Sequence, residues 1–210
     1  ASRLIPSIAV LVGAKRFSVE GGDALLPMME HLLRVGAPEG LSEVVIGMAH
    51  RGRVNMLATY CGKPLDLIFS EFEGKHDTNQ GFTADGDVKY HMGYSSLVKT
   101  NAGKDVRLTL APNPSHLETV GPIMQGISRA IIEHDDNFAK GITASILIHG
   151  DAAVAGQGVV YEVVQMAGLK AYEVGGTIHI VVNNQVGFTT NYIDARTSTY
   201  CTDIAKVTQC

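Results

Sequence analysis

The chain has 210 residues, of which 45% are hydrophobic and 18% charged, so it is long enough to bury a sizeable core. This composition excludes a disordered, a collagenous and a disulfide-stapled protein. The formal net charge of −4 provides no basic field for nucleic acid or an anionic membrane surface. The longest apolar runs are also far shorter than the roughly 20 residues that a membrane helix needs.

The cysteines and the chain ends give two further expectations. Cys61, Cys201 and Cys210 have no CxxC spacing, which indicates a reducing compartment and no structural zinc. No signal peptide or transit segment is recognisable, and the first residue is Ala1 rather than Met. We therefore expect this sequence to be a piece of a longer protein.

Helical and strand patterns alternate along the chain. The apolar spacing predicts helices that begin at an Asp23 N-cap and at Pro64, and that span Ser115 to about Asp135 and Gly158 to Leu169. Short β-branched runs predict strands at Glu43–Met48, Val106–Ala111, Ile142–Ile148 and Thr177–Val182, and residues 74–86 are expected to form an exposed loop. Such alternation predicts an α/β domain, with helices on a mostly parallel sheet and sites at the carboxyl ends of the strands.

The third predicted strand continues into a glycine-bearing turn, His149 to Gly158. A turn that leads into a helix offers backbone N–H groups to a phosphate. The dinucleotide fingerprint fails here because no third glycine follows Gly156 and Gly158 at the required spacing, and no Gly-Lys-Ser/Thr P-loop occurs in the chain. Since the Asp151 carboxylate would repel a bare phosphate, the turn favours a metal-bound one.

The fourth predicted strand ends at Asn183 and Asn184, whose amide oxygens suit a hard cation such as Mg²⁺. If these two strands are neighbours, Asp151 and Asn184 face the same crevice. A simpler interpretation stays open at this point, in which Asp151 caps a helix and the asparagines form a turn.

Together, Gly150-Asp151 and Asn183-Asn184 resemble the two halves of the thiamine diphosphate motif, with Ala152 in place of its second glycine. That departure fits one branch of these enzymes, the thiamine-dependent first component of the 2-oxoglutarate dehydrogenase complex. The resemblance to this family extends from about Arg16 to the C-terminus. Four further segments match it: Gly47-Met-Ala-His-Arg-Gly-Arg53, Gly86-Asp-Val-Lys-Tyr-His-Met-Gly93, Asn113-Pro-Ser-His-Leu-Glu118 and Asn183-Asn-Gln-Val-Gly-Phe-Thr-Thr190.

The resemblance implies a set of cofactor ligands. Asp151, the side-chain oxygen of Asn184 and the backbone carbonyl of Val186 are expected to hold Mg²⁺, and Arg51 to contact the diphosphate. Arg53 is expected to be structural. The simpler role for Arg51 is a surface ion pair.

The resemblance also distinguishes histidines expected at the site from histidines expected elsewhere. His50 and His91 match family histidines on the substrate side of the thiazolium ring, where imidazoles stabilise developing charge and move protons. Ser95 matches a position near the substrate. His116 and His149 are expected close to the cofactor, in direct contact or as scaffolding. Surface or structural roles are expected for the other histidines, which are His31, His76, His134 and His179.

The implied activity is oxidative decarboxylation of 2-oxoglutarate, with the succinyl group passed to lipoamide of an acyltransferase component. The activating glutamate of this family belongs to a pyrimidine-binding domain, which no segment here resembles. Residues 1–210 are therefore expected to form a single diphosphate-binding domain of a homodimeric enzyme and to be inactive alone. A bacterial cytoplasm is the expected compartment, with the mitochondrial matrix as the second choice.

Two alternatives remain at the level of sequence. One is a sibling thiamine enzyme, such as a 2-oxoadipate dehydrogenase or a 2-oxoglutarate decarboxylase or carboligase, because these share nearly all of the motifs. The other is a non-catalytic α/β nucleotide-binding module. Mg²⁺-dependent binding of thiamine diphosphate separates that module from the enzymes.

Overall fold

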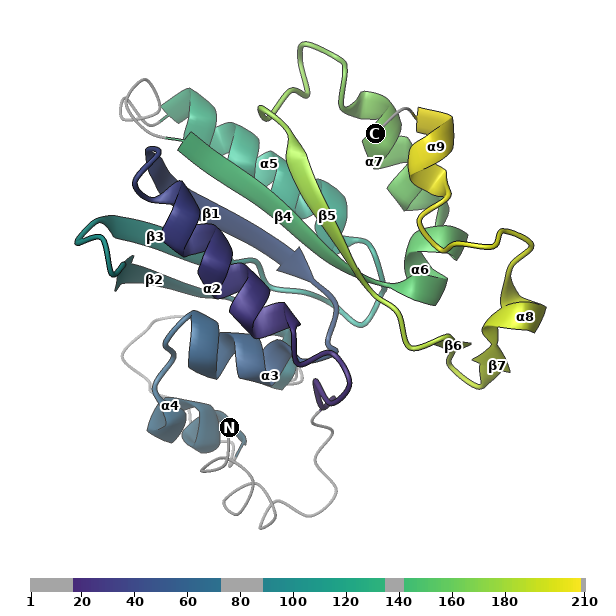
Figure 1. Cartoon of the computed structure of the whole chain (residues 1–210), viewed down its shortest axis with the longest axis horizontal. Helices are drawn as coiled ribbons and strands as arrows, with labels where there is room; N and C mark the ends of the chain where they lie inside the picture. Colours follow the sequence, from purple (N-terminus) through teal and green to yellow (C-terminus); the bar gives the residue numbers. More distant parts are fainter. Residues whose placement is uncertain (1–16, 73–88, 135–141, 209–210) are drawn as a thin grey trace.

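A computed structural model describes residues 17–72, 89–134 and 142–208. Within these ranges one sheet has the strand order β2-β3-β1-β4-β5 (Figure 1). Its strands are β1 (Leu41–Met48), β2 (Tyr94–Lys99), β3 (Asp105–Leu110), β4 (Ile142–Gly150) and β5 (Thr177–Val182). β1 pairs in parallel with β3 and β4, β4 pairs in parallel with β5, and β2 is antiparallel to β3. The predicted mostly parallel α/β sheet is confirmed.

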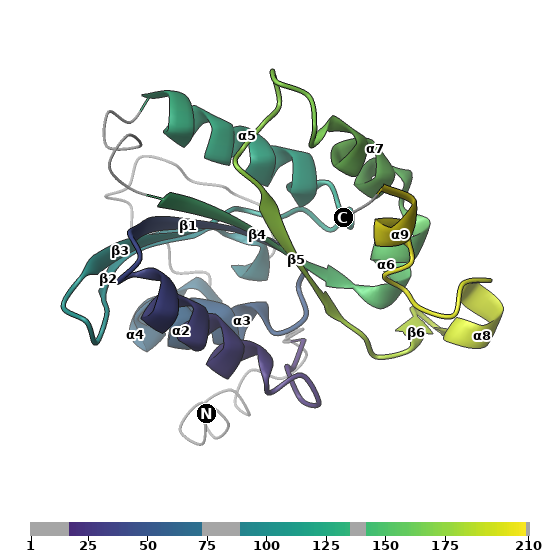
Figure 2. The same cartoon turned by 45° about the horizontal axis from the view of Figure 1, so that its top comes forward.

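Helices cover both faces of the sheet. Figure 2 shows α5 (Val120–His134) and α7 (Gly158–Met166) over one face, and α2 (Leu25–Gly36), α3 (Arg53–Asn55) and α4 (Leu65–Phe72) under the other. A π-helical turn, Met56–Tyr60, continues α3. The larger core lies on the α2 side and includes Leu33, Ile46 and Leu108, whereas Val45 and Leu147 point to Met124 of α5. β1 and β4 are buried over most of their length, which explains the continuous apolar runs of these two strands in the sequence.

Two predicted helix starts are wrong. The N-cap of α2 is Ala24, and the Asp23 carboxylate instead accepts a 3.1 Å hydrogen bond from the N–H of Gly21. The helix predicted from Ser115 begins only at Val120, because Glu118 has a φ of 72°, which a right-handed helix cannot contain. The expected loop at residues 74–86 and His76 lie outside the described residues.

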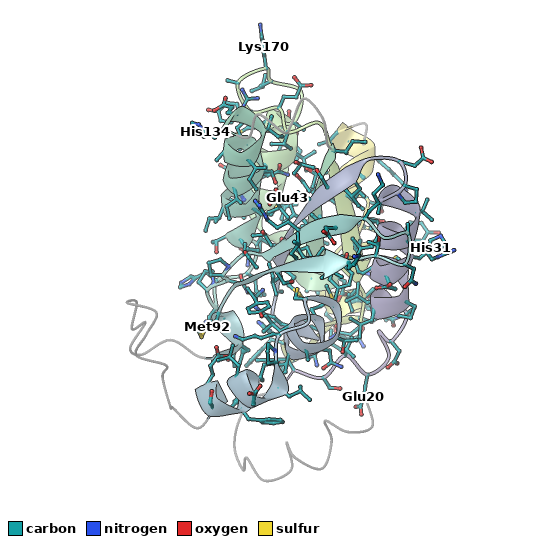
Figure 3. The ribbon with its side chains drawn as sticks, turned by 90° about the vertical axis from the view of Figure 1, so that its left-hand side faces the viewer. Glu20, His31, Glu43, Met92, His134 and Lys170 are labelled. Carbon is teal, nitrogen blue, oxygen red and sulfur yellow. The ribbon has the colours of Figure 1, made fainter. Side chains whose placement is uncertain are left out.

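The peripheral histidines lie where the sequence places them. His31 and His134 are exposed and project from opposite sides of the molecule, on α2 and at the end of α5 (Figure 3). None of the helices within the described residues is long and apolar enough to cross a membrane.

The carboxyl ends of β1, β3, β4 and β5 share one edge of the sheet, since these strands are parallel. At this edge the chain after β1 turns into α3 beneath the sheet, whereas the chain after β4 turns into α6 (Asp151–Gly156) and then α7 on the α5 face. In open α/β sheets, the point where the connections of neighbouring strands diverge in this way is the usual place for a ligand.

Candidate functional site

Asp151 and Asn184 meet at the ends of two neighbouring strands. Asp151 is the first residue of α6, directly after β4, and is 2% exposed. Its Oδ1 accepts a 3.3 Å hydrogen bond from the backbone N–H of Asn184, two residues beyond β5. Because β4 and β5 pair in parallel, the two side chains lie at one edge of the sheet, as predicted. Asp151 is not a helix cap, since the N-cap of α6 is Gly150.

The loop after β5 is held by its own asparagines. Asn183 Oδ1 accepts from the N–H of Gln185 at 3.0 Å, and Asn184 Oδ1 accepts from the N–H of Val186 at 3.1 Å. The alternative interpretation of the asparagine pair as a turn is therefore correct in geometry. Gln185 has a φ of 63°, a conformation that costs a non-glycine residue energy and that clusters at functional sites.

A close contact joins the two halves of this site. Val186 and Gly187 form β6, which pairs with β7 (Thr190–Asn191). A Cβ added to Gly187 would lie 2.9 Å from the Cβ of Ala152. Only glycine fits at position 187 while alanine occupies position 152, so the alanine that departs from the general motif is accommodated by a glycine on the facing loop.

Three ionisable side chains form a chain beside Asp151. The Nδ1 of His149 lies 2.6 Å from Glu118 Oε2, and its Nε2 lies 2.9 Å from Nδ1 of His179. Glu118 and His149 are 7% and 4% exposed. When Glu118 is ionised it only accepts, so His149 donates through Nδ1–H and, as a neutral ring, accepts from His179. Partial burial lowers the pKa of His179, a positive charge on His149 would lower it further, and Glu118 opposes both.

A second cluster contains the two histidines predicted to face the substrate. The ring of Tyr90 lies between them, with centroids 4.8 Å from His91 and 6.4 Å from His50. Phe17 packs on His50 at 4.0 Å. The structure therefore brings His50 and His91 to the same cluster, although they come from loops 41 positions apart in sequence.

An open hollow of about 370 Å³ adjoins His91. Its lining comes from His91, from the segment after β3 and from one residue of α5, and consists of His91, Pro112, Asn113, Pro114, Ser115, His116 and Ile123. His91 is 3% exposed and its Nε2 lies 3.3 Å from the Ser115 hydroxyl. Asn113 is 2% exposed, and neither polar atom of its amide has a hydrogen-bond partner in the described protein. Unpaired buried amides are costly, so Asn113 marks this wall as one suited to a polar ligand.

The sequence family described as dehydrogenase E1 component matches residues 14–210 of this chain. The chain belongs to this family. It is 52% identical over 198 residues to the 2-oxoglutarate dehydrogenase E1 component of Azotobacter vinelandii, covering 94% of this chain and 21% of that protein.

Two further relatives have similar identities. The 2-oxoglutarate dehydrogenase E1 component of Haemophilus influenzae is 50% identical over 94% of this chain. The multifunctional 2-oxoglutarate metabolism enzyme of Mycolicibacterium vanbaalenii is 50% identical over 93% of this chain. The chain spans 16–21% of the length of these relatives.

Of the remaining residues expected from the E1 resemblance, one lines the hollow beside His91 and two do not. Arg51 is exposed, donates to the carbonyl of Ser18 at 3.3 Å and lies over the Phe17 ring. Ser95 is exposed on β2, where its hydroxyl donates to Thr109 at 3.3 Å, and it is not among the described residues that line the hollow. His116 is exposed and lines that hollow.

Arg53 is structural, as the sequence predicts. It is fully buried, and its guanidinium donates to the backbone carbonyls of Met48, Met92 and Ala111 at 3.2, 3.0 and 2.6 Å. It thereby joins the ends of β1 and β3 to the segment that carries His91. Burial lowers the pKa of Arg53 to about 10, which leaves it charged at neutral pH.

The donor set around Asp151 fits a hard divalent cation. No three His, Cys, Asp or Glu side chains gather as a metal site in the part of the chain described. A cation here would instead use one buried carboxylate, one amide oxygen and one backbone carbonyl, from Asp151, Asn184 and Val186, which are oxygen donors of the kind Mg²⁺ takes together with water and phosphate. A site with so little negative charge of its own suits a cation that arrives with a phosphate.

Arg196 is a site residue that the sequence reasoning missed. Its Nη1 donates to Asp151 Oδ2 at 3.2 Å, and its side chain is only 10% exposed. Glu118 and Asn113 were quoted only as parts of a motif. Its place in that motif was the available signal for Glu118, since its partner His149 is 31 positions away, and no spacing rule connects Arg196 with Asp151.

Proposed function

We propose that this protein acts as the thiamine-diphosphate-dependent first component of a 2-oxoglutarate dehydrogenase. In this function 2-oxoglutarate is oxidatively decarboxylated and the succinyl group passes to the lipoyl group of a succinyltransferase component. The observation that supports the proposal most is the hydrogen-bonded pair of Asp151 and Asn184 at the carboxyl ends of adjacent parallel strands. Oxygen donors in this arrangement suit a metal-bound diphosphate.

In the proposed site, the Asp151 carboxylate, the Asn184 amide oxygen and the Val186 carbonyl hold Mg²⁺. Arg51 reaches the diphosphate by leaving its present contact with the Ser18 carbonyl, which an exposed guanidinium does at small cost. Thiamine diphosphate, when bound, supplies the nucleophilic carbon that attacks the 2-oxo group and the electron sink that allows loss of CO₂.

The substrate side of the proposed site is the wall formed by the His50 and His91 cluster and the adjoining hollow. His91, which contacts the Ser115 hydroxyl, donates a hydrogen bond to the substrate oxygen on which negative charge develops. His50 donates a hydrogen bond to the substrate carboxylate and takes part in proton transfer. The unpaired Asn113 amide and His116 add polar groups to the hollow. Ser95 stays a proposed substrate neighbour, further from this wall.

The proposed substrate rests on the relatives' names, all of which contain 2-oxoglutarate. The name of the Mycolicibacterium relative describes a multifunctional enzyme, and for this reason decarboxylase or carboligase activity is kept as the second candidate. Both candidates need the same metal and diphosphate ligands, so they differ only in what accepts the intermediate.

The wider organisation is also a proposal. Residues 1–210 form one diphosphate-binding domain, a separate pyrimidine-binding domain supplies the activating glutamate, and two copies of the full protein assemble as a dimer. A lipoyl-bearing succinyltransferase is the proposed protein partner, and neither nucleic acid nor a membrane is. The bacterial cytoplasm is the proposed location.

The experiment is a comparison of substrates in the full-length protein with Mg²⁺, thiamine diphosphate and an artificial electron acceptor. We expect a kcat/KM for 2-oxoglutarate at least tenfold above that for 2-oxoadipate. In a second reaction without the artificial acceptor, where the lipoyl disulfide takes the electrons, we expect succinylation of an added lipoyl domain. Asp151→Asn is expected to remove activity, whereas Asp105→Asn, at an exposed strand position, is its matched control. A preference for 2-oxoadipate, or CO₂ release without acyl transfer to the lipoyl domain in the reaction that lacks the artificial acceptor, contradicts the proposal.

A further inference from the structure

We propose that Arg196 makes the binding of Mg²⁺ at Asp151 depend on the diphosphate, so that the metal alone binds weakly. This inference rests on the proposed function, because it concerns the same metal site. It starts from a contact that neither the motifs nor the relatives' names provide. Arg196 Nη1 donates to Asp151 Oδ2 at 3.2 Å, and the two side chains are 10% and 2% exposed.

The position of Arg196 is fixed by its own segment. It follows α8 (Tyr192–Ala195), a short helix whose N-cap, Asn191, accepts a 3.1 Å hydrogen bond from the N–H of Ile193. The N–H of Arg196 donates to the Tyr192 carbonyl at 3.2 Å, and its guanidinium lies 5.2 Å from the centroid of the Tyr192 ring. Because backbone and side chain are both anchored, the positive charge is held at the Asp151 carboxylate.

This contact changes the charge that an arriving cation meets. The carboxylate of Asp151 is neutralised by the guanidinium at Oδ2, while Oδ1 accepts, within the described residues, only the neutral N–H of Asn184. A metal ion that binds at the free side of Oδ1 therefore approaches a pair without net charge and is repelled by the nearby guanidinium. Such repulsion is weakly screened where both side chains are buried.

A diphosphate reverses this balance. It carries several negative charges, which attract both the metal ion and the guanidinium and so offset the repulsion between these two positive charges. The Nε of Arg196 is buried and has no hydrogen-bond partner in the described part of the chain, so the side chain retains a donor. Arg196 thus disfavours the metal alone and favours the metal together with the diphosphate, which is a coupling between two ligands.

The test is a set of calorimetric titrations of the full-length protein with Mg²⁺ alone, with inorganic pyrophosphate alone, and with Mg²⁺ in saturating pyrophosphate. In the wild-type protein we expect pyrophosphate to raise Mg²⁺ affinity at least tenfold. In Arg196→Gln we expect Mg²⁺ alone to bind several-fold more tightly, and the ratio of the two Mg²⁺ affinities to fall at least fivefold. Arg196→Lys keeps the charge and is expected to keep the ratio within threefold of wild type.

Controls separate this inference from misfolding and from failure of the proposed function. Arg34→Gln removes an exposed arginine of α2 whose guanidinium lies 2.9 Å from His31, and should change no affinity. Should Arg196→Gln not fold, Arg196→Met repeats the titrations, since methionine fills the space over Tyr192 without a charge.

The outcomes are distinct. An unchanged ratio in Arg196→Gln or Arg196→Met overturns the role of Arg196, even if Asp151→Asn abolishes Mg²⁺ binding. Weaker binding of Mg²⁺ alone in either variant overturns it as well, because the arginine would then be helping the metal directly. If wild-type protein shows no Mg²⁺-dependent binding of pyrophosphate or thiamine diphosphate, the proposed function itself fails.

Discussion

The backbone N–H of Asn184 donates a 3.3 Å hydrogen bond to the carboxylate of Asp151, 33 residues earlier in the chain. The contact exists because β4 and β5 are adjacent and parallel, so that the loops at their carboxyl ends begin side by side. One loop supplies a buried carboxylate and the other an amide oxygen. The geometry of the sheet alone therefore brings together the two side chains that we propose as ligands of the cation.

The close approach of Gly187 to Ala152 gives a prediction with a built-in rescue. Gly187→Ala places a Cβ 2.9 Å from the Cβ of Ala152, so β6 must shift and carry the Val186 carbonyl with it. We expect a loss of about 1–3 kcal/mol in unfolding free energy, together with weaker Mg²⁺-dependent binding of thiamine diphosphate. Adding Ala152→Gly should restore both quantities. A double variant as impaired as the single one shows that this contact is not the cause.

The buried hydrogen bond between Glu118 and His149 predicts a stability effect. Glu118→Gln keeps the shape of the side chain but removes its charge from a 2.6 Å contact with a buried imidazole. We expect urea unfolding to show a loss of about 1–3 kcal/mol. Glu133→Gln, which breaks an exposed i,i+4 pair with Arg129, should cost less than about 0.5 kcal/mol. Equal losses would show that the buried contact contributes nothing special.

The lowered pKa of His179 predicts how stability changes with pH. Burial and the charge of His149 depress the pKa of His179 in the folded state below the unfolded value of about 6.5. The unfolded state then binds more protons, so the stabilising contribution is complete above that value and is lost as pH falls through the folded pKa. The free energy of unfolding of His179→Asn should therefore fall less than that of wild type between about pH 7.5 and pH 5. His31→Asn, at an exposed position, should follow the wild-type curve, and parallel curves for His179→Asn contradict the assignment.

His50 and His91 predict a separation of binding from turnover. Both belong to the cluster around Tyr90, and neither is a proposed ligand of the metal or of the diphosphate, so their loss should leave Mg²⁺-dependent cofactor affinity nearly unchanged. Each alanine variant of the full-length protein should lower kcat about 10²–10³-fold, the usual effect of removing one donor that acts on developing charge. A variant with normal kcat and weakened cofactor binding would place that histidine beside the cofactor instead.

Much of the fold could be predicted because its central strands carry strong local signals. β1, β4 and β5 are apolar and β-branched, and each is followed by a glycine or asparagine turn that bears the motif residues. β2 was missed because Tyr94-Ser-Ser-Leu-Val-Lys99 is a half-buried edge strand with polar residues at its start. The start of α5 was misplaced because the positive φ of Glu118 has no signature in the sequence.

The site was predictable only where a motif contains it. Asp151 and Asn184 follow predicted strands, so their meeting was expected once those strands were assumed to be neighbours. The contact of Arg196 with Asp151 could not be predicted, because it depends on the path of residues 186–196 through β6, β7 and α8. The contact of His179 with His149 could not be predicted either. The sequence places His179 inside a strand, but its partner is set by the register of β4 against β5.

The most direct test of the account is a calorimetric titration of thiamine diphosphate into wild-type protein and Asp151→Asn, each with Mg²⁺ and with a chelator. Wild-type protein should bind only with Mg²⁺. Asp151→Asn should lose at least tenfold in affinity, because an amide replaces the one anionic ligand of the metal. Since Asp151 also pairs with Arg196, the variant should lose about 1–3 kcal/mol of stability as well, and folding is checked at the same temperature. Equal affinity in the folded variant, or binding of the wild type that ignores Mg²⁺, would contradict the assignment of Asp151 as a metal ligand.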